Sequence, residues 1–401
     1  MVKRIPIADL RPGMRVARLE SDAWMQDPTL YTREGTIRSA EDVASILRQG
    51  YREVVVQMDE TEDVRPRTLD DLAALVLRKS PERHEASIVP FEEELVEARR
   101  VYFRAFKTAS RVVMDTVQGK PVDMTASRRT VRELSESVAR NREALGCLSK
   151  LTRFEAYLYS HMVNVTVFSL AFGRFIGLAD GELKALGLAA FLHDIGKTSL
   201  PLAILAKNGR LTAVEREQTR RHPQYGVLLL KHAPGVTKAL KLTVLHHHEN
   251  FDGSGYPEGI SGERINLHAR ILHLADIYDA LTSDRFYDRP RTPAGALSSM
   301  YAMRGVEFAP EDVERFIKCL GIYPSGSLIR LTSGEVAVVL QNFSDRPLTP
   351  LVKVVLDPEQ RPRLSELLDL GSQASGASLS VAATVNPQAE GIDMASIMAV
   401  F

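Results

Sequence analysis

The histidines of this chain are confined to one stretch of it, and this distribution constrains the fold more than any other feature. Nine of the ten histidines lie between His161 and His273. Several stand, together with aspartates, in segments whose other residues are apolar and follow a helical pattern. A buried imidazole or carboxylate is costly unless it finds a charged or hydrogen-bonding partner. We therefore expect these segments to fold around a shared partner, and a metal cluster would serve all of them together.

Composition and charge narrow the class of protein. The chain has 401 residues, of which 44% are hydrophobic, and at roughly 150 residues per domain it has room for two or three domains. Its 51 basic residues balance 51 acidic ones, which removes the electrostatic attraction of a dedicated nucleic-acid binder. The only cysteines, Cys147 and Cys319, are too few for a disulfide framework. No apolar run of about 18 residues and no signal-peptide core occur, so we expect a cytoplasmic protein without membrane contact.

The periodicity of the sequence predicts a mainly α protein with β structure near both ends. Short extended runs indicate a small α/β domain at the N-terminus, and a 3.6-residue period from Pro90 onward predicts helices. Short β-like runs after Gly321 indicate a β-rich C-terminal appendage, followed by a Ser-, Ala- and Gly-rich tail. We divide the chain into an N-terminal α/β domain (1–60), a linker and connecting helices (61–145), a helical domain (146–322), a small β appendage (323–370) and a flexible tail (371–401).

Local signals predict individual elements. Ser39 is a candidate N-cap for a helix over 40–48, and an apolar run predicts a buried strand at 53–57. One amphipathic helix is expected to end at Gly119, and a second to run from about Thr125 to Leu145. The other expected elements are a helix near 69–77 and strands at 328–331, 335–340 and 351–356.

Four motifs carry the histidines and aspartates in a fixed order. They are His193-Asp194-Ile-Gly-Lys197, His222-Pro-x-x-Gly226, His247-His-Glu-x-x-Asp-Gly-x-Gly-Tyr-Pro257 and Asp276-Ile-Tyr-Asp-Ala-Leu-Thr-Ser-Asp-Arg285. With these motifs the helical domain resembles HD-GYP domains, a branch of the HD phosphohydrolase superfamily that includes cyclic di-GMP phosphodiesterases. Residues 1–60 resemble the small domain of unknown function that often precedes such domains. Together the two resemblances cover well over half of the chain.

The resemblance implies a binuclear metal site in which Asp194 bridges the ions. The matching ligand positions are His161, His193, Asp194, His222, His247, His248 and Asp276. Some members hold a third metal through a carboxylate four residues before the first histidine; Tyr157 stands there, and Glu155 is too far round the helix. We therefore expect two divalent ions. Imidazole and carboxylate ligands without thiolates suit iron, manganese, nickel or zinc, and the resemblance favours iron or manganese.

Other residues match the family's substrate positions. Lys197 and Arg285 match cations that contact phosphate, and Lys197 is expected to act with Asp194 in catalysis. Tyr256 has two open roles, stacking on a guanine or pinning its own loop.

Two neighbours of the ligands have other expected positions. His246 points about 100° away from His247 around a helix, which favours a position behind the ligands or an exposed one over a place in the ligand set. Asp279 shares a helix face with Asp276 and could orient a ligand histidine.

The activity that the resemblance implies is hydrolysis of cyclic di-GMP to linear pGpG, which lowers the level of a bacterial second messenger. Further cleavage to GMP is left open. Two cations about 3.5–4 Å apart can neutralise phosphate oxygens and lower the pKa of water to about 7. The Gly-Tyr-Pro loop implies contact with diguanylate cyclase domains, and the helices over 90–145 leave a homodimer open.

Two alternatives stay open. One is an HD phosphohydrolase that acts on another nucleotide, although ordinary members lack the Gly-Tyr-Pro loop. The other is a low-activity cyclic di-GMP sensor or scaffold. Asp288 favours the second alternative, because many members carry a basic residue there and a carboxylate repels a substrate phosphate.

Overall fold

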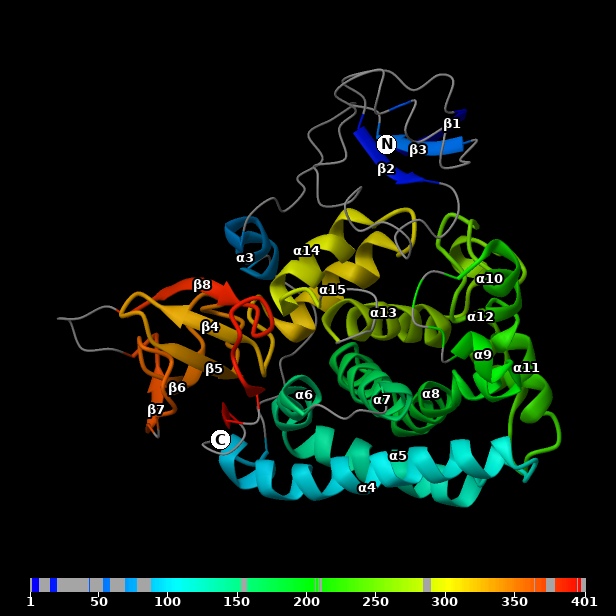
Figure 1. The fold of residues 1–401 in the computed structure, drawn as a ribbon, viewed down its shortest axis with the longest axis horizontal. Helices are drawn as coiled ribbons and strands as arrows, with labels where there is room; N and C mark the ends of the chain where they lie inside the picture. Colours follow the sequence, from blue (N-terminus) through cyan, green and yellow to red (C-terminus); the bar gives the residue numbers. More distant parts are fainter. Residues whose placement is uncertain are drawn as a thin grey trace.

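A computed structural model gives the fold of this protein (Figure 1). It describes residues 2–6, 15–19, 43, 53–57, 69–77, 88–152, 157–205, 207, 209, 211–283, 290–363, 365–372, 379–394 and 396–397. Among these residues helices predominate and β structure forms two small sheets, which confirms the mainly α class. No helix in the described part of the chain is long and apolar enough to cross a membrane.

The N-terminal residues form a three-stranded antiparallel sheet. Its outer strands β1 (Val2–Pro6) and β2 (Arg15–Leu19) both pair with the central β3 (Glu53–Gln57). The strand expected at 53–57 is therefore confirmed, and so is the helix that follows it, α3 (Leu69–Leu77). The helix expected over 40–48 lies outside the described residues, apart from the helical Val43.

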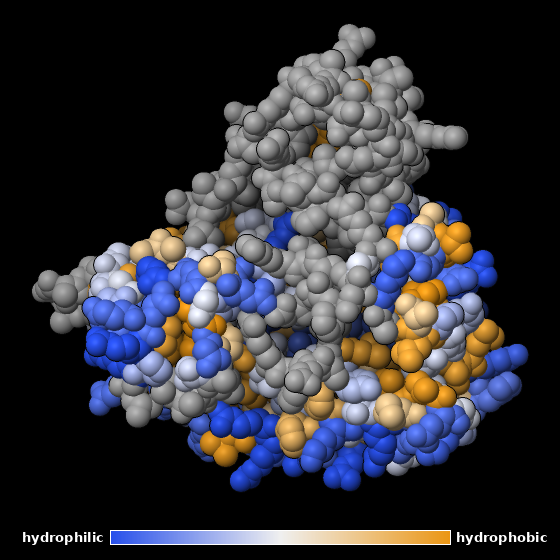
Figure 2. All heavy atoms as spheres, in the orientation of Figure 1, coloured by the Kyte–Doolittle hydropathy of each residue, from blue (hydrophilic) through white to orange (hydrophobic). Residues whose placement is uncertain are grey.

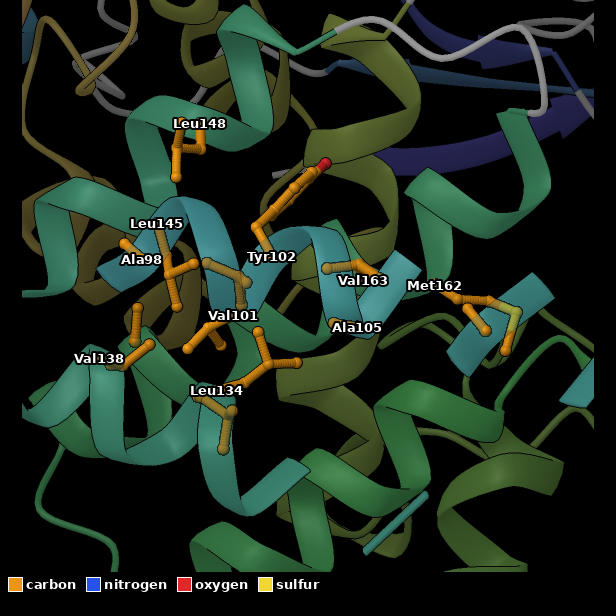
Figure 3. Close-up of a cluster of buried hydrophobic side chains, with 14 of the residues drawn as sticks. Ala98, Val101, Tyr102, Ala105, Leu134, Val138, Leu145, Leu148, Met162 and Val163 are labelled. Atoms are coloured by element: carbon orange, nitrogen blue, oxygen red, sulfur yellow. The ribbon is translucent and has the colours of Figure 1, made fainter. Parts of the chain in front are cut away.

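Two long amphipathic helices form one layer of the helical domain. α4 (Phe91–Val117) and α5 (Met124–Arg140) lie along the lower edge of the molecule in Figure 1, and that edge is largely hydrophilic in Figure 2. Asp123 caps α5 by accepting a hydrogen bond from a backbone N–H of the first turn at 2.9 Å. On the inner side, Val101 and Leu134 belong to an apolar core shared with the next helices (Figure 3). Removing this surface from water is what holds the layer in place.

The second connecting helix is broken, contrary to the prediction of one helix from Thr125 to Leu145. α5 ends at Arg140, and α6 covers Arg142–Leu151. Between them, the backbone of Asn141 is extended. The Asn141 side chain accepts a hydrogen bond from the N–H of Glu143 and donates one to the carbonyl of Val89, both at 3.0 Å. A cap and a tertiary hydrogen bond therefore interrupt the helical pattern at Asn141.

The centre of the domain is a bundle of helices around α7. α7 (Tyr157–Phe175) packs against α8 (Asp180–Leu192) and α13 (Leu267–Thr282). The remaining helices are η3 (Ile195–Ser199), α9 (Leu202–Leu205), α10 (Ala213–Thr219), α11 (His222–Leu229), α12 (Lys238–His246), η4 (Gly262–Arg264), α14 (Pro293–Ala302) and α15 (Pro310–Leu320).

A five-stranded antiparallel sheet closes the chain and confirms the expected β appendage. β4 (Leu328–Leu331), β5 (Val336–Gln341), β6 (Leu351–Leu356), β7 (Leu367–Asp369) and β8 (Val381–Val385) are arranged in the order β7-β6-β5-β4-β8. The expectation of a flexible tail over 371–401 does not hold for residues 381–385, because β8 pairs there with β4. Val385 and Ile397, 1% and 0% exposed, also join the apolar core.

Candidate metal centre

The structure brings all seven predicted ligand positions together, in overlapping groups whose ligand atoms lie within 4.8 Å of one another. Most of them stand at the ends of helices, where a side chain can turn into the domain centre. They are His161 within α7, His193 at the end of α8, Asp194 just before η3, His222 at the start of α11, His247 and His248 after α12, and Asp276 within α13. All are buried except His248, which is half-buried.

Local hydrogen bonds fix how the imidazoles point. In His193, His222 and His247, Nδ1 lies 2.6–2.8 Å from the backbone carbonyl three residues earlier. Because a carbonyl only accepts, Nδ1 carries the hydrogen and Nε2 keeps its lone pair. In His161 the same role falls to Asp279, whose Oδ2 lies 2.8 Å from Nδ1. Four Nε2 atoms are therefore prepared as metal ligands.

Gly196 allows the His193-Asp194 turn to lie against the start of α11. A Cβ atom at this position would lie 1.9 Å from the carbonyl oxygen of His222 and 2.4 Å from the nitrogen of Gly226. Only a glycine therefore permits the close backbone approach that places Asp194 beside His222.

Asp194 occupies the middle of the cluster. Its Oδ1 lies 3.2 Å from Nε2 of His222, and its Oδ2 lies 3.3 Å from Nε2 of His193 and 3.5 Å from Nε2 of His161. Lys197 donates a hydrogen bond of 2.5 Å to Oδ2. The two oxygens thus face different histidines, as a carboxylate shared between two ions would.

The donor set fits divalent cations. Among the described buried side-chain atoms, Nε2 of His193 and Oδ1 of Asp194 have no hydrogen-bond partner. Nε2 of His222 and Nε2 of His247 lie 3.2 Å apart, and each carries a lone pair because its Nδ1 holds the hydrogen. Two buried lone pairs at this distance repel each other unless a cation lies between them. Imidazole nitrogens and carboxylates supply such a site.

Burial sets the charge of the ligands. It lowers the pKa of His222, and it lowers those of His247 and His248 further, so that these rings are neutral near pH 7. Burial alone would raise the pKa values of Asp194 and Asp276, but neighbouring cationic and imidazole groups hold both well below their usual range. Neutral imidazoles beside ionised carboxylates are the protonation states that bind metal ions.

A cleft that is partly open to solvent lies beside the cluster. Lys197 and Tyr256 line it together with His248. The Tyr256 ring stacks on His248, with ring centroids 4.8 Å apart and an angle of 25°. This contact joins the Gly-Tyr-Pro loop directly to a predicted ligand.

Some sequence-predicted positions lie outside the described residues. Arg285 and Asp288 belong to the segment 284–289, and Glu155 belongs to 153–156. The side chain of Tyr157 is likewise not described. His246, which was expected either behind the ligands or exposed, is buried, and its Nε2 lies 3.0 Å from Oε2 of Glu258.

Two residues that hold the site together were missed by sequence reasoning. The side chain of Lys150, 6% exposed, lies beside Asp279, with Nζ 3.3 Å from Oδ1, although the two residues are far apart in the chain. Glu249 is buried behind the Gly-Tyr-Pro loop, and its Oε1 accepts hydrogen bonds from the N–H groups of Glu258 and Gly259 at 2.7 and 3.1 Å. The position of Glu249 inside the third motif was a signal for its role. No local signal marked Lys150.

The fold and the site define a class: a helical domain that gathers imidazoles and carboxylates for divalent cations beside an open cleft. The chain belongs to the HD domain family, which matches residues 111–311. A second family, a domain of unknown function designated DUF3391, matches residues 2–127. The resemblance drawn from the motifs is thereby confirmed, for both parts of the chain.

One curated relative covers most of the chain, and others cover about half of it or more. A cyclic di-GMP phosphodiesterase of Pseudomonas aeruginosa is 35% identical over 92% of this chain and 89% of its own length. A cyclic di-GMP phosphodiesterase response regulator of Xanthomonas campestris is 36% identical over 49% of this chain and 52% of its own length. A 3′3′-cGAMP-specific phosphodiesterase of Vibrio cholerae is 31% identical over 61% of this chain and 45% of its own length.

Proposed function

We propose that this protein hydrolyses cyclic di-GMP to linear pGpG with the help of two divalent metal ions. One observation carries the proposal: Asp194 lies between two groups of histidines, beside a cleft that contains Lys197. The long match to a relative named for this activity supports the choice of substrate. Further cleavage to GMP remains part of the proposal to be tested.

The number of ions follows from the grouping of the ligands. Two of the three groups share no residue: one consists of His222, His247 and His248, and the other of His161, His193 and Asp276. The third group, His193, Asp194 and His247, takes one histidine from each and so joins them. Asp194 reaches toward both groups through its two oxygens. We therefore assign one ion to each group and a bridging role to Asp194. The ligand set without thiolates suits iron, manganese, nickel or zinc, and among these the resemblance to HD-GYP domains favours iron or manganese.

The ions and the residues around the cluster have separate roles in the proposed reaction. The bound ions would supply Lewis acidity toward a phosphodiester and lower the pKa of water. The side chain of Lys197, 26% exposed, is directed at Asp194 from the edge of the cleft and can also bind a phosphate oxygen. The buried histidines exclude bulk water, which strengthens the electrostatic interactions of the phosphate.

The test is a turnover assay on protein loaded anaerobically with iron or with manganese. We expect pGpG to accumulate from cyclic di-GMP, as measured by liquid chromatography. 3′3′-cGAMP is assayed in parallel, because some relatives carry its name. Preference for 3′3′-cGAMP in kcat/KM would make the protein a phosphodiesterase for another nucleotide. Tight binding of cyclic di-GMP without any product would make it a sensor.

The predicted partners and location complete the proposal. Contact with diguanylate cyclase domains through the Gly-Tyr-Pro loop is proposed from the resemblance to HD-GYP domains alone. A homodimer through α4 is supported by the exposed apolar side chains Val96, Phe103 and Met114. Cys147 and Cys319 are both free and buried, which agrees with action in the cytoplasm. Binding assays with cyclase domains, and molar mass in solution, test the two partners.

A further inference from the structure

Two arginines line the cleft on the side of α10, next to the metal cluster. Arg216 and Arg220 are four residues apart, so that they share one side of this helical segment, and both belong to the wall of the cleft. Both are half-buried, whereas the neighbouring Glu217, Gln218 and Arg221 are exposed. The pair is thus directed into the cleft rather than into solvent.

Arg220 is also in contact with the Gly-Tyr-Pro loop. Its guanidinium carbon lies 5.1 Å from the centre of the Tyr256 ring, and that ring in turn stacks on His248. A guanidinium that lies on an aromatic face directs its N–H groups outward in its own plane, where they can donate to an anion. Arg220 also stands two residues before His222, so any phosphate it binds lies close to the cluster.

The other charged groups of the cleft do not neutralise a second phosphate of the substrate. Lys197 donates its hydrogen bond to Asp194 at the cluster, and Asp276 is engaged with His161 at 3.1 Å. Glu307 is a further acidic group of the lining. A cyclic dinucleotide carries two phosphodiesters, of which only one can be attacked at the cluster at a time. The second phosphate brings a negative charge that the cluster and Lys197 do not neutralise.

We propose that Arg216 and Arg220 bind the phosphodiester that is not being cleaved, and so select cyclic dinucleotides over compounds with a single phosphodiester. Arginine suits this role because its planar fork forms paired hydrogen bonds to phosphate oxygens. The inference rests on the proposed function and adds a second phosphate subsite to it.

The experiment compares Arg216→Gln and Arg220→Gln with Arg221→Gln, an exposed neighbour outside the cleft. Each metal-loaded variant is assayed with cyclic di-GMP and with bis(4-nitrophenyl) phosphate, which has one phosphodiester. We expect KM for cyclic di-GMP to rise about tenfold or more in the two cleft variants, with kcat within about twofold, since hydrogen bonds to charged groups contribute about 1.5–3 kcal/mol. Both parameters for bis(4-nitrophenyl) phosphate, and all parameters of Arg221→Gln, should stay unchanged.

Three results would overturn the subsite. One is an unchanged KM for cyclic di-GMP in both cleft variants. The second is an equal loss with both substrates, which would show that the arginines only hold Tyr256 and the loop. The third comes from calorimetry with a phosphorothioate analogue of cyclic di-GMP: equal affinity for wild type and for the Arg216→Gln, Arg220→Gln double variant. Because calorimetry needs no turnover, it decides the subsite even if wild type hydrolyses no cyclic di-GMP, an outcome that would refute the proposed function alone.

Discussion

Oδ2 of Asp279 lies 2.8 Å from Nδ1 of His161, and both side chains are at most 2% exposed. Asn164 donates a 3.0 Å hydrogen bond to the other carboxylate oxygen, and Tyr102 on α4 donates one of 2.6 Å to Asn164. Lys150 completes the surroundings of this carboxylate. A predicted metal ligand is thus oriented by a buried network that reaches the first long helix of the domain.

Asp279→Asn is expected to weaken metal binding without unfolding the domain. An amide keeps the shape but loses the charge that orients His161, and loss of such partners lowers metal affinity about 10–100-fold. It also leaves Lys150 buried beside a neutral group, which lowers the free energy of unfolding by about 3–5 kcal/mol. Metal titration and urea unfolding of the metal-free protein measure the two effects.

The double variant Asp279→Asn, Lys150→Met separates those effects. Removing the buried cation should recover part of the lost stability, while metal affinity stays low because His161 is still without its carboxylate. Recovery of both quantities would show that Asp279 serves only to neutralise Lys150.

The carboxylate of Glu249 is expected to hold the Gly-Tyr-Pro loop. Glu249→Leu leaves the N–H groups of Glu258 and Gly259 without their acceptor, at a cost of about 1–3 kcal/mol for a buried donor. Hydrogen exchange of residues 250–260 should therefore accelerate by tenfold or more, roughly as that energy implies. Glu249→Gln keeps an acceptor oxygen and should exchange much more slowly than the leucine variant. Equal rates in the two variants would assign the effect to packing.

Gly196 and Gly146 can be compared by the same substitution, because a Cβ atom would be crowded at the first and unhindered at the second. Gly196→Ala places a Cβ against backbone atoms of His222 and Gly226, which cannot move aside as a side chain would, so we expect a loss of about 3 kcal/mol or more. Gly146 lies inside α6, where a Cβ atom would meet nothing within 4 Å, and Gly146→Ala should stabilise by about 0.5–1 kcal/mol. Thermal unfolding measures both, and a similar sign for the two would contradict the steric argument.

The ion pair of Asp369, at the end of β7, should make the stability of the fold depend on pH at a place away from the metal site. Arg346 donates to both carboxylate oxygens, at 2.8 Å for Oδ2, and so lowers the pKa of Asp369; the N–H of Gly371 contributes further. Since the folded pKa lies below the unfolded one, the stabilisation is present above about pH 4 and is lost as the pH falls through the folded pKa.

Asp369→Asn should therefore lower the free energy of unfolding at pH 7 by up to about 1 kcal/mol, as for other partly exposed ion pairs. The difference from wild type should shrink as the pH falls below 4. The exposed Asp345→Asn serves as the control and should show a smaller change. A difference that is the same at every pH would assign the effect of Asp369 to the shape of the side chain rather than its charge.

Six of the seven ligand positions could be predicted because each belongs to one of the four short motifs, and His161 was predicted from the family resemblance. The residues that orient and support the ligands could not be predicted, because their contacts join positions that are far apart in the chain. Asn141 interrupts a helical pattern through a bond to the carbonyl of Val89, and Lys150 meets Asp279 although the two stand 129 residues apart in the chain. Strand β8 could not be predicted, because the segment around it is rich in Ser, Ala and Gly. Its pairing depends on β4, which lies about 50 residues earlier in the chain.

The strongest test of the metal centre is Asp194→Ala. The two Asp194 oxygens face His222 on one side and His193 and His161 on the other, so its removal takes charge and a ligand from both proposed ions. His248→Ala removes one ligand from one group, and water can take its place. We expect Asp194→Ala to abolish turnover and to lower bound metal more than His248→Ala, as measured by elemental analysis, with the helical circular dichroism spectrum retained.

Lys197→Ala is the matched contrast for Asp194→Ala, because the two side chains share a hydrogen bond but only one of them can ligate a cation. It should leave the metal content intact and reduce turnover through the lost contact with phosphate. Two bound ions and near-normal rates in Asp194→Ala would disprove the bridge. Loss of metal in Lys197→Ala would instead show that the lysine holds Asp194 in its ligating position, since nothing else about the ligand set changes in that variant.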